Sequence, residues 1–142
     1  MSNSLYINGQ WLAGEGQSLT SLNPALGEAI WQGHAASSAQ VEQAIKAARG
    51  AAGSWAQTPL AERQAIVERF GKLLVDNKEP MARLIAEETG KPLWETLTEA
   101  AAMAGKIAIS VKANQERTGD SETDLGAARS ALRHKPHGVV AV

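Results

Sequence analysis

The sequence predicts an α/β fold in which two strand pairs come first, four helices follow, and further strands come last. Three observations lead to this prediction. An Asn-Gly pair lies between two β-prone runs near the start, apolar residues recur at helical spacing from residue 37 onward, and a β-branched run follows residue 138. The hydrophobic period changes from about two to about 3.6 where the strands give way to helices.

Two hairpins are expected at the start of the chain. In LYINGQWL, Asn8 and Gly9 can both take the positive φ that a two-residue hairpin turn requires, so residues 5–12 are predicted to form the first hairpin. The second hairpin has an extended segment up to Leu22, a turn built on a proline and a glycine, and another extended segment at residues 28–33.

The first helix is predicted to begin after Ser37, which can form a capping box with Gln40. Glu42 lies four residues before Lys46, at the spacing of a helical ion pair. Apolar residues at a period of about 3.6 make this helix amphipathic. The predicted stripe consists of Val41, Ala44, Ile45, Ala48, Ala52 and Trp55.

The second helix is expected to have Thr58 as its N-cap and Pro59 as its first residue, and to end near Asn77. Glu68 is placed to pair with Lys72 one turn later. The predicted apolar stripe of this helix consists of Ile66, Phe70, Leu73 and Leu74.

Two further helices meet at the hexapeptide EETGKP, residues 87–92. The third helix begins at Glu79 and Pro80 and ends near Gly90, because glycine suits the left-handed residue that follows a helix end. Pro92 begins the fourth helix, which is expected to run for about seven turns. Its alanine-rich stripe predicts close helix packing and consists of Trp94, Leu97, Ala101, Ala104, Ala108 and Val111.

The Gly-Lys pair of EETGKP does not belong to a phosphate-binding loop. That motif needs a glycine at position 85 and a hydroxyl residue after the lysine, where this chain has Ile85 and Pro92. From the residues alone, Gly90 ends a helix and Lys91 faces water near the negative end of the helix dipole.

The other polar residues give no strong signal of catalysis or metal binding. Glu95 and Glu99 share a helix face and are interpreted as solvated side chains rather than as a catalytic pair. His34, His134 and His137 lack the cysteine or acidic partners that metal sites usually have, and they are interpreted as structural or exposed.

The composition is that of an ordinary soluble chain of about one domain. It has 142 residues, a formal net charge of -1, 44% hydrophobic residues and no cysteine. The charge balance predicts no nucleic-acid partner, and no run approaches the roughly 20 apolar residues of a membrane span. We therefore expect a cytoplasmic location. Without cysteine, the chain has no thiol nucleophile.

The last part of the sequence is predicted to form a polar loop at residues 119–128 and then a β-like segment. The segment ends in the apolar run Val139, Val140, Ala141 and Val142, which suits a strand with neighbours on both sides. We therefore expect the sequence to be the first part of a longer protein.

A series of short motifs follows the order of these elements: Asn23, Pro24, Gly27 and Glu28; Ala47, Ala48, Arg49 and Trp55; Glu62 and Arg63; Glu88 to Pro92; Arg133, His134, Pro136, Gly138, Val139 and Val140. In order and spacing these motifs resemble the N-terminal part of the aldehyde dehydrogenases over the whole chain. The resemblance implies that residues 1–119 open the cofactor-binding domain, residues 120–137 form an oligomerisation strand segment, and residues 138–142 start the next cofactor-domain strand.

Within the family, residues 31–44, 106–119 and 130–142 are most similar to the branch that oxidises N-succinyl-L-glutamate 5-semialdehyde to N-succinylglutamate in bacterial arginine catabolism. The resemblance implies NAD as the cofactor, a cysteine nucleophile, an oxyanion hole and a glutamate base. It places all of these beyond residue 142. The 142-residue chain alone is therefore expected to be inactive.

The resemblance also implies three roles for residues of this chain. Met103 and Lys106 would line the mouth of the substrate tunnel, where Lys106 could attract a dicarboxylate. The backbone carbonyls of Ser21 and Leu22 and the carboxylate of Glu88 would hold a structural monovalent cation, for which hard oxygen ligands are suitable. Residues 129–136 would pair with another subunit and make the enzyme a homo-oligomer.

Two alternatives remain open from the sequence. The substrate could be another semialdehyde or an aliphatic aldehyde, because the residues that select the substrate are expected mostly outside this chain. The chain could also be a non-enzymatic helical interaction module whose alanine-rich helices and terminal strands bind a partner. A module of this kind should fold alone, and a dehydrogenase fragment should not.

Overall fold

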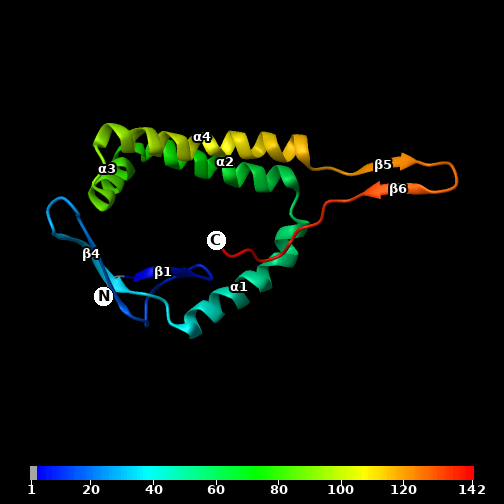
Figure 1. Cartoon of the computed structure of the whole chain (residues 1–142). Coiled ribbons are helices and arrows are strands. Elements are labelled where there is room, and N and C mark those ends of the chain that lie inside the picture. Colours follow the sequence, from blue (N-terminus) through cyan, green and yellow to red (C-terminus); the bar gives the residue numbers. More distant parts are fainter. Residues whose placement is uncertain (1–2) are drawn as a thin grey trace.

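The structure is a computed structural model that describes residues 3–142 (Figure 1). It confirms the predicted α/β organisation, with hairpins before the helices and another hairpin after them. The strands are β1 (Asn3–Ile7), β2 (Gln10–Ala13), β3 (Ser18–Leu22), β4 (Ala29–His34), β5 (Ser121–Asp124) and β6 (Arg129–Leu132). The helices are α1 (Ser38–Gln57), α2 (Leu60–Asp76), α3 (Lys78–Thr89) and α4 (Leu93–Arg117).

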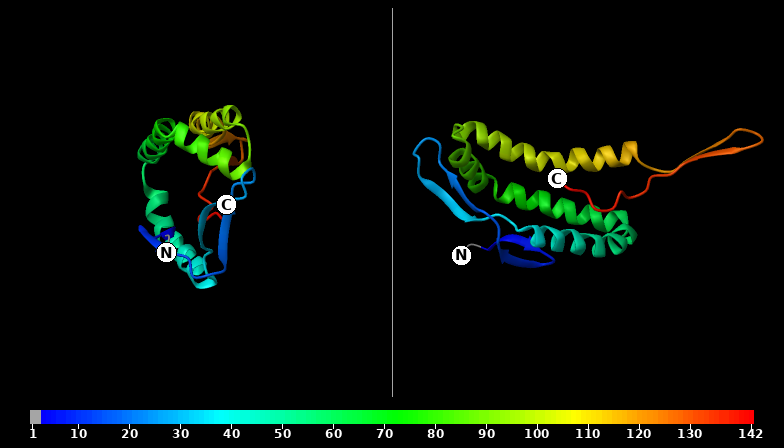
Figure 2. Two further views of the ribbon diagram at one scale, coloured as in Figure 1. Left: turned by 90° about the vertical axis from the view of Figure 1, so that its left-hand side faces the viewer. Right: turned by 60° about the horizontal axis from the view of Figure 1, so that its bottom comes forward.

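The elements form an open frame. In Figure 1, α1 runs along the lower side, while α2 and α4 lie side by side along the upper side with α3 at their end. The β3–β4 hairpin rises from the start of α1 toward α3. Figure 2 shows the same frame from two other directions, with the β5–β6 hairpin extending beyond the helices. Within residues 3–142, the strands pair in three separate antiparallel two-stranded sheets.

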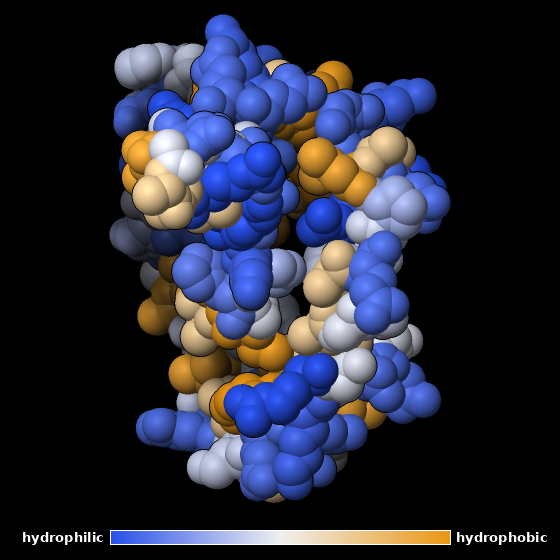
Figure 3. Space-filling view, turned by 90° about the vertical axis from the view of Figure 1, so that its right-hand side faces the viewer, coloured by the Kyte–Doolittle hydropathy of each residue, from blue (hydrophilic) through white to orange (hydrophobic). Residues whose placement is uncertain are grey.

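The frame surrounds an opening. The space-filling view in Figure 3 shows this opening through the middle of the molecule, with apolar side chains along parts of its rim. Many large apolar side chains on the helices are exposed, among them Trp55, Phe70, Leu73, Leu84 and Trp94. Within residues 3–142, no helix is both long enough and apolar enough to cross a membrane.

The two N-terminal hairpins form where they were predicted. Asn8 and Gly9 form the turn between β1 and β2 with φ of 50° and 81°, so both take the left-handed conformation. In the second hairpin, the Asn23 side chain accepts hydrogen bonds from the backbone N–H groups of Ala25 and Leu26, at 2.9 and 3.2 Å. These bonds shape the turn between β3 and β4.

The capping box at the start of α1 is confirmed, and it also joins α1 to the first hairpin. Gln40 is buried, and its Oε1 accepts hydrogen bonds from the backbone N–H groups of Ser37 and Glu15, both at 3.0 Å. Its Nε2 donates to the carbonyl of Ala13 at 2.9 Å. One glutamine therefore fixes the start of α1 against the end of β2.

Small residues form the contacts between the helices. Ala82 of α3 is fully buried, as is Thr96 of α4, and Ala100 of α4 is 2% exposed. The hydroxyl of Thr96 donates to the carbonyl of Leu93 at 3.1 Å, which satisfies this polar group inside the interface. The predicted close packing of α4 is therefore confirmed, although the residues that provide it differ from the predicted ones.

The predicted stripe of α4 was partly wrong. Trp94 is 70% exposed, and Ala101 and Ala108 are exposed too. The helix instead packs on the face that contains Thr96 and Ala100. Hydrophobicity alone did not identify this face, because a threonine that bonds its own helix backbone can be buried at low cost.

The predicted start of α2 was wrong by one residue. Pro59 occupies the N-cap position and α2 begins at Leu60, with no side-chain cap. Thr58 instead ends α1, where its hydroxyl donates to the carbonyl of Ser54 at 3.0 Å. Only Thr58 and Pro59 connect the two helices. Thr58 ends α1 and Pro59 precedes α2, so the threonine cannot also cap the second helix.

The predicted stripe of α2 was also partly wrong. Leu74 is buried as predicted, but Ile66, Phe70 and Leu73 are exposed in this structure, and Gly71 is buried in their place. The helix approaches α4 through its glycine, which brings the two backbones close together and leaves the larger side chains outside the contact.

Two ion-pair predictions on the helices had different outcomes. Glu42 pairs with Lys46 in α1 at 2.8 Å, as predicted. In α2, Glu68 accepts a hydrogen bond at 2.9 Å from Gln64, one turn before it, rather than pairing with the predicted partner Lys72, one turn after it. Both partners lie four residues from Glu68, so helical spacing alone could not choose between them.

The region after α4 differs from the prediction in one respect. The predicted polar loop at residues 119–128 contains a strand, β5, which pairs with β6. Arg133 joins Glu122 of β5 and, at 3.5 Å, Asp120 in ion pairs beside this hairpin. All residues of both strands are exposed. Because neither face is buried, β5 has no alternating apolar pattern that could predict it.

Candidate functional site

The hexapeptide EETGKP forms the corner between α3 and α4. Gly90 has a φ of 74°, and its N–H donates to the carbonyl of Ala86 at 2.9 Å, which ends α3 as predicted. The hydroxyl of Thr89 donates to the carbonyl of Ile85 at 2.7 Å. Pro92 occupies the N-cap position of α4. These contacts give the corner a defined backbone path.

The corner meets the second hairpin. Ser21 lies at the end of β3, and its hydroxyl donates a hydrogen bond to Oε1 of Glu88 at 2.8 Å. Beside this contact, a Cβ added to Gly90 would lie 3.0 Å from Cγ of Pro24 in the β3–β4 turn. Residues that are 66 or 67 positions apart in the sequence therefore touch at this corner.

Lys91 is not simply solvated, in contrast to the interpretation from the sequence. It forms an ion pair with Glu99 on α4, and the exposed fractions of these two side chains are 42% and 37%. The hydrogen bond that Lys91 donates to Glu99, the negative charge of Glu99 and the weaker field of Glu95 raise the pKa of Lys91 above its ordinary value. Lys91 therefore ties the corner to α4, with its cationic form favoured.

Three of the predicted site residues are close together at this corner. Ser21 and Leu22 are adjacent at the end of β3, and Ser21 contacts Glu88. The regular pairing of β3 with β4 is interrupted between Ser21 and Leu22, where the register shifts. A carboxylate beside an irregular strand end is a suitable donor set for a hard monovalent cation.

The other two predicted site residues, Met103 and Lys106, lie three residues apart on α4. Met103 is 40% exposed, and Lys106 is exposed as well. Residues at this spacing are neighbours on a helix surface. The two side chains are thus accessible and neighbouring on α4, further along the helix than the EETGKP corner.

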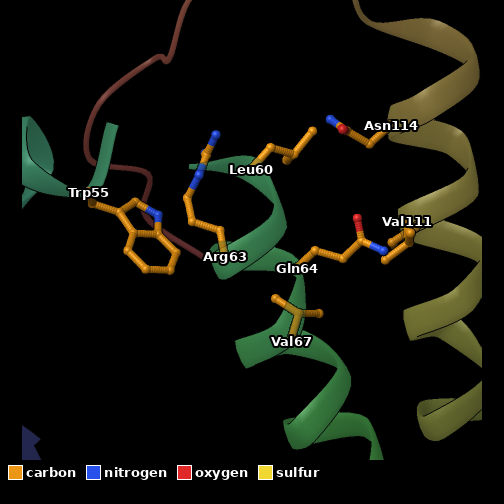
Figure 4. A pocket seen from close by; sticks show the side chains of 8 residues that line it. Trp55, Leu60, Arg63, Gln64, Val67, Val111 and Asn114 are labelled. Atoms are coloured by element: carbon orange, nitrogen blue, oxygen red, sulfur yellow. The ribbon is translucent and has the colours of Figure 1, made fainter. Parts of the chain in front are cut away.

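A separate pocket lies where α1, α2 and α4 meet (Figure 4). It has a volume of about 250 Å³, and its lining residues are Trp55, Leu60, Arg63, Gln64, Val67, Ser110, Val111 and Asn114. The guanidinium of Arg63 lies over the ring of Trp55, 6.0 Å from its centroid, and Nε donates to the carbonyl of Thr58 at 3.1 Å. Arg63 is the one ionisable residue in this lining, so the pocket has no acid–base pair for catalysis.

The chemistry present in the chain is limited. The sequence contains no cysteine, and within residues 3–142 no group of three or more histidine and acidic side chains could hold a metal ion. Gly14 and Gly16 follow β2 and lie against the backbone of residues 34–36. The described residues can therefore position neighbouring elements, but they provide no nucleophile of the thiol type.

Comparison with known proteins defines the class to which this fold belongs. The profile of the aldehyde dehydrogenase family matches residues 11–142. The chain therefore belongs to the aldehyde dehydrogenase family. Expectations drawn from the sequence motifs are confirmed to this extent.

Curated relatives make the comparison more specific. The N-succinylglutamate 5-semialdehyde dehydrogenase of Chromobacterium violaceum is 55% identical over 139 residues, which are 98% of this chain and 29% of that protein. The enzyme of the same name from Pseudomonas fluorescens is 52% identical over 140 residues, 99% of this chain and 29% of that protein. The chain thus spans less than a third of the length of these relatives.

Solved structures agree with the fold. An NAD-dependent benzaldehyde dehydrogenase from Corynebacterium glutamicum matches with a TM-score of 0.76 and 29% identity, over 83% of this chain and 26% of that chain. An aldehyde dehydrogenase from Brucella melitensis biovar abortus matches with a TM-score of 0.80 and 26% identity, over 88% of this chain and 26% of that chain. The frame of hairpins and helices is therefore an arrangement that family members share.

Sequence reasoning missed the contacts that join distant elements. Gln40 was predicted to cap a helix, but nothing in the sequence indicated its bonds to Ala13 and Glu15. The approach of Pro24 to Gly90 was missed as well. Local spacing contains no information on such pairs. The available signal was chemical: a helix-capping glutamine has hydrogen-bonding groups that remain to be satisfied when it is buried.

Proposed function

We propose that this chain forms the N-terminal part of an NAD-dependent aldehyde dehydrogenase that oxidises N-succinyl-L-glutamate 5-semialdehyde to N-succinylglutamate in arginine catabolism. The observation that carries the proposal is the identity of 52 to 55% with N-succinylglutamate 5-semialdehyde dehydrogenases over nearly the whole chain. The proposed reaction consumes one aldehyde, one NAD⁺ and one water, and forms one carboxylate, one NADH and two protons. NAD supplies the two-electron oxidant.

Within this enzyme, we assign a supporting role to the described residues. Residues 1–119 would open the cofactor-binding domain, residues 120–137 would form the oligomerisation segment, and residues 138–142 would begin the next strand of the cofactor domain. The absence of cysteine from the chain fits this assignment, because the thiol nucleophile would then come from another part of the protein. The residues that bind NAD would also lie outside this chain.

Substrate recognition is the one direct contribution that we assign to this chain. Met103 and Lys106 would face the mouth of the substrate tunnel, where the positive charge of Lys106 would attract the two carboxylates of the substrate. Their exposure and their spacing on α4 support this role. The exposed β5–β6 hairpin supports the further proposal that residues 129–136 contribute to a homo-oligomer interface in the cytoplasm.

The cation proposal concerns the EETGKP corner. Glu88 and the carbonyls of Ser21 and Leu22 would hold a sodium or potassium ion that stabilises the fold without entering the reaction. A crystal of the full-length protein grown in a rubidium salt tests this, because rubidium gives an anomalous signal. We expect a peak beside Glu88 that is lost in Glu88→Gln. Absence of a peak from the wild-type crystal would rule out the site.

The enzymatic proposal is tested by following NADH formation by the full-length protein with three aldehydes. These are N-succinylglutamate semialdehyde, an aliphatic aldehyde of similar length and benzaldehyde. We expect the succinylated substrate to have the highest kcat/KM by about tenfold or more, the scale of a lost charge-assisted contact. A preference for either other aldehyde would contradict the substrate but not the class of enzyme, and no NADH with any of them would contradict both.

Lys106 provides a sharper test of substrate recognition. Lys106→Met keeps the length of the side chain and removes its charge, and Lys112→Met on the same helix is the matched control. We expect Lys106→Met to raise KM for the succinylated substrate about fivefold with little change in kcat, because a charge that only attracts the substrate acts on binding. An unchanged KM would remove Lys106 from the proposed site.

A further inference from the structure

The β3–β4 turn and the α3–α4 corner touch through two independent contacts. One is polar, the hydrogen bond of 2.8 Å from the Ser21 hydroxyl to Glu88. The other is a close approach, in which Gly90 leaves room for the ring of Pro24. The contacts involve Glu88 and Gly90 of the corner, together with Ser21 of β3 and Pro24 at the start of the turn. Together they fix the position of the hairpin turn against the corner.

The place of this contact in the fold shows why it is needed to hold the hairpin. The hairpin rises from the start of α1 and reaches the helical layer near α3 (Figures 1 and 2). Among the described residues each sheet has two strands, and isolated two-stranded hairpins are marginally stable in water. A hairpin of this kind needs support from another element, and at its turn the corner is the neighbour that provides polar and steric contacts.

The corner itself is built to hold a fixed shape. Gly90 ends α3 in the left-handed conformation, and Lys91 is tied to Glu99 on α4. The turn is also ordered from within, because the Asn23 N–H donates to the carbonyl of Glu28 at 2.8 Å and the Gly27 N–H donates to the carbonyl of Asn23 at 2.8 Å. Two ordered surfaces thus meet.

We propose that the EETGKP corner is a latch that docks the β3–β4 hairpin onto the helical layer, with the Ser21–Glu88 hydrogen bond as its polar contact and Gly90 against Pro24 as its steric contact. The latch makes the hairpin and the helices move as one body. It works by direct contact between the two segments and requires no bound cation, so it stands separately from the cation proposal above.

Hydrogen–deuterium exchange of the full-length protein tests the latch. Ser21→Ala and Glu88→Ala each remove the polar contact, and we expect each to raise the exchange rates of the Asn23 and Gly27 amides about fivefold, the equivalent of one net hydrogen bond. The double variant should exchange no faster than either single variant. Effects that add in the double variant would mean that the two side chains act separately, and would overturn the proposal.

Matched controls separate the latch from general effects of substitution. Ser18→Ala changes another serine of β3, and Glu87→Ala removes the preceding carboxylate of α3. Both should leave exchange of the turn amides unchanged. If Glu87→Ala accelerated exchange as much as Glu88→Ala, the effect would come from charge rather than from the contact, and the proposal would fail.

The steric contact has its own test. Gly90→Ala brings a methyl group toward Pro24, and it also strains the left-handed backbone. Combining Gly90→Ala with Pro24→Ala removes the ring carbon that the new methyl group would contact, but it leaves the backbone strain at position 90. We therefore expect the double variant to recover part of the lost protection in the turn. No recovery would contradict the Gly90–Pro24 contact.

Changing the salt in the buffer distinguishes a direct latch from a bound cation that bridges the two segments. Exchange of the turn amides is compared in sodium or potassium chloride and in choline chloride at the same ionic strength. The direct latch predicts that Ser21→Ala accelerates exchange of the turn amides by the same factor in all three salts, because the Ser21–Glu88 hydrogen bond needs no alkali cation. If Ser21→Ala had no effect in choline chloride, the contact would depend on a bound cation, and the direct latch would be rejected.

Discussion

Gly71 of α2 lies directly against Ile107 of α4. A Cβ added to Gly71 would be 3.0 Å from Cγ1 and 3.3 Å from Cβ of Ile107. These distances are shorter than normal van der Waals separations, so the missing side chain sets how closely the two helices approach. The position of α4, and with it the position of Met103 and Lys106, depends on this contact.

The first prediction concerns this helix contact. Gly71→Ala should lower the stability of the protein relative to Gly105→Ala by about 1–3 kcal/mol, because overpacking opposes the gain in helix propensity. Gly105 is the matched control, since it lies in α4 with nothing within 4 Å of an added Cβ. Thermal unfolding of the two variants measures the difference. Equal stabilisation by both substitutions would show that the helices are not limited by Gly71.

A second prediction follows from the hydrogen bonds of Gln40. Gln40→Ala removes three bonds and leaves the Ala13 carbonyl and two backbone N–H groups without their partner. We expect a loss of about 2–3 kcal/mol in the free energy of unfolding. Gln43→Ala, on an exposed turn of the same helix, should change it by less than about 0.5 kcal/mol. Denaturation in urea compares the variants, and similar values for both would contradict the role of Gln40.

The third prediction is a pH dependence. Glu99 raises the pKa of Lys91 above its ordinary value of 10.5. The stability from this ion pair is therefore fully present below pH 10.5 and is lost as the pH rises through the raised pKa. The melting temperature of the wild type should fall more steeply in this alkaline range than that of Lys91→Met. Lys72→Met should follow the wild type, and a wild-type curve parallel to that of Lys91→Met would contradict the ion pair.

Arg63 gives the fourth prediction. Its guanidinium lies over Trp55 and donates to the carbonyl of Thr58, so it joins the end of α1 to the start of α2. Arg63→Ala should cost about 1–2 kcal/mol in the free energy of unfolding, and Arg63→Lys should recover only part of this loss. Arg69→Ala on the exposed side of α2 provides the control. Full recovery by lysine would mean that charge alone matters at this position.

Local chemistry explains which parts of the fold could be predicted from the sequence. The turn at Asn8 and Gly9, the capping box of Ser37 and Gln40 and the helix end at Gly90 each depend on residues within a few positions of one another. Their conformational preferences are strong enough to determine the local backbone. These features were confirmed in the structure.

The buried faces of the helices could not be predicted in the same way. Phe70 and Trp94 are apolar and were assigned to stripes, yet both are exposed in this structure, while Gly71 and Thr96 are buried. Helix–helix contacts depend on how closely backbones approach, and small residues favour that approach more than large apolar ones. Periodicity counts the large residues and therefore missed the buried Gly71 and Thr96.

The candidate site, too, could be predicted from the sequence only in part. The roles of Glu88 and Lys106 came from the family resemblance, which also grouped Ser21 with Glu88, and the structure adds the direct hydrogen bond between these two side chains. Lys91 was interpreted as solvated because its partner Glu99 lies eight residues away across a helix boundary. No helical spacing rule covers a pair of this kind.

The most direct test of the central claim is to purify the native protein that contains this sequence and to measure its intact mass and its NADH-forming activity with N-succinylglutamate semialdehyde in the same chromatographic peak. We expect the activity to elute with a polypeptide several times larger than the 15.0 kDa of these residues. An inactive polypeptide, or an active one of only 15.0 kDa, would contradict the claim that these residues support a catalytic centre located elsewhere in a longer dehydrogenase.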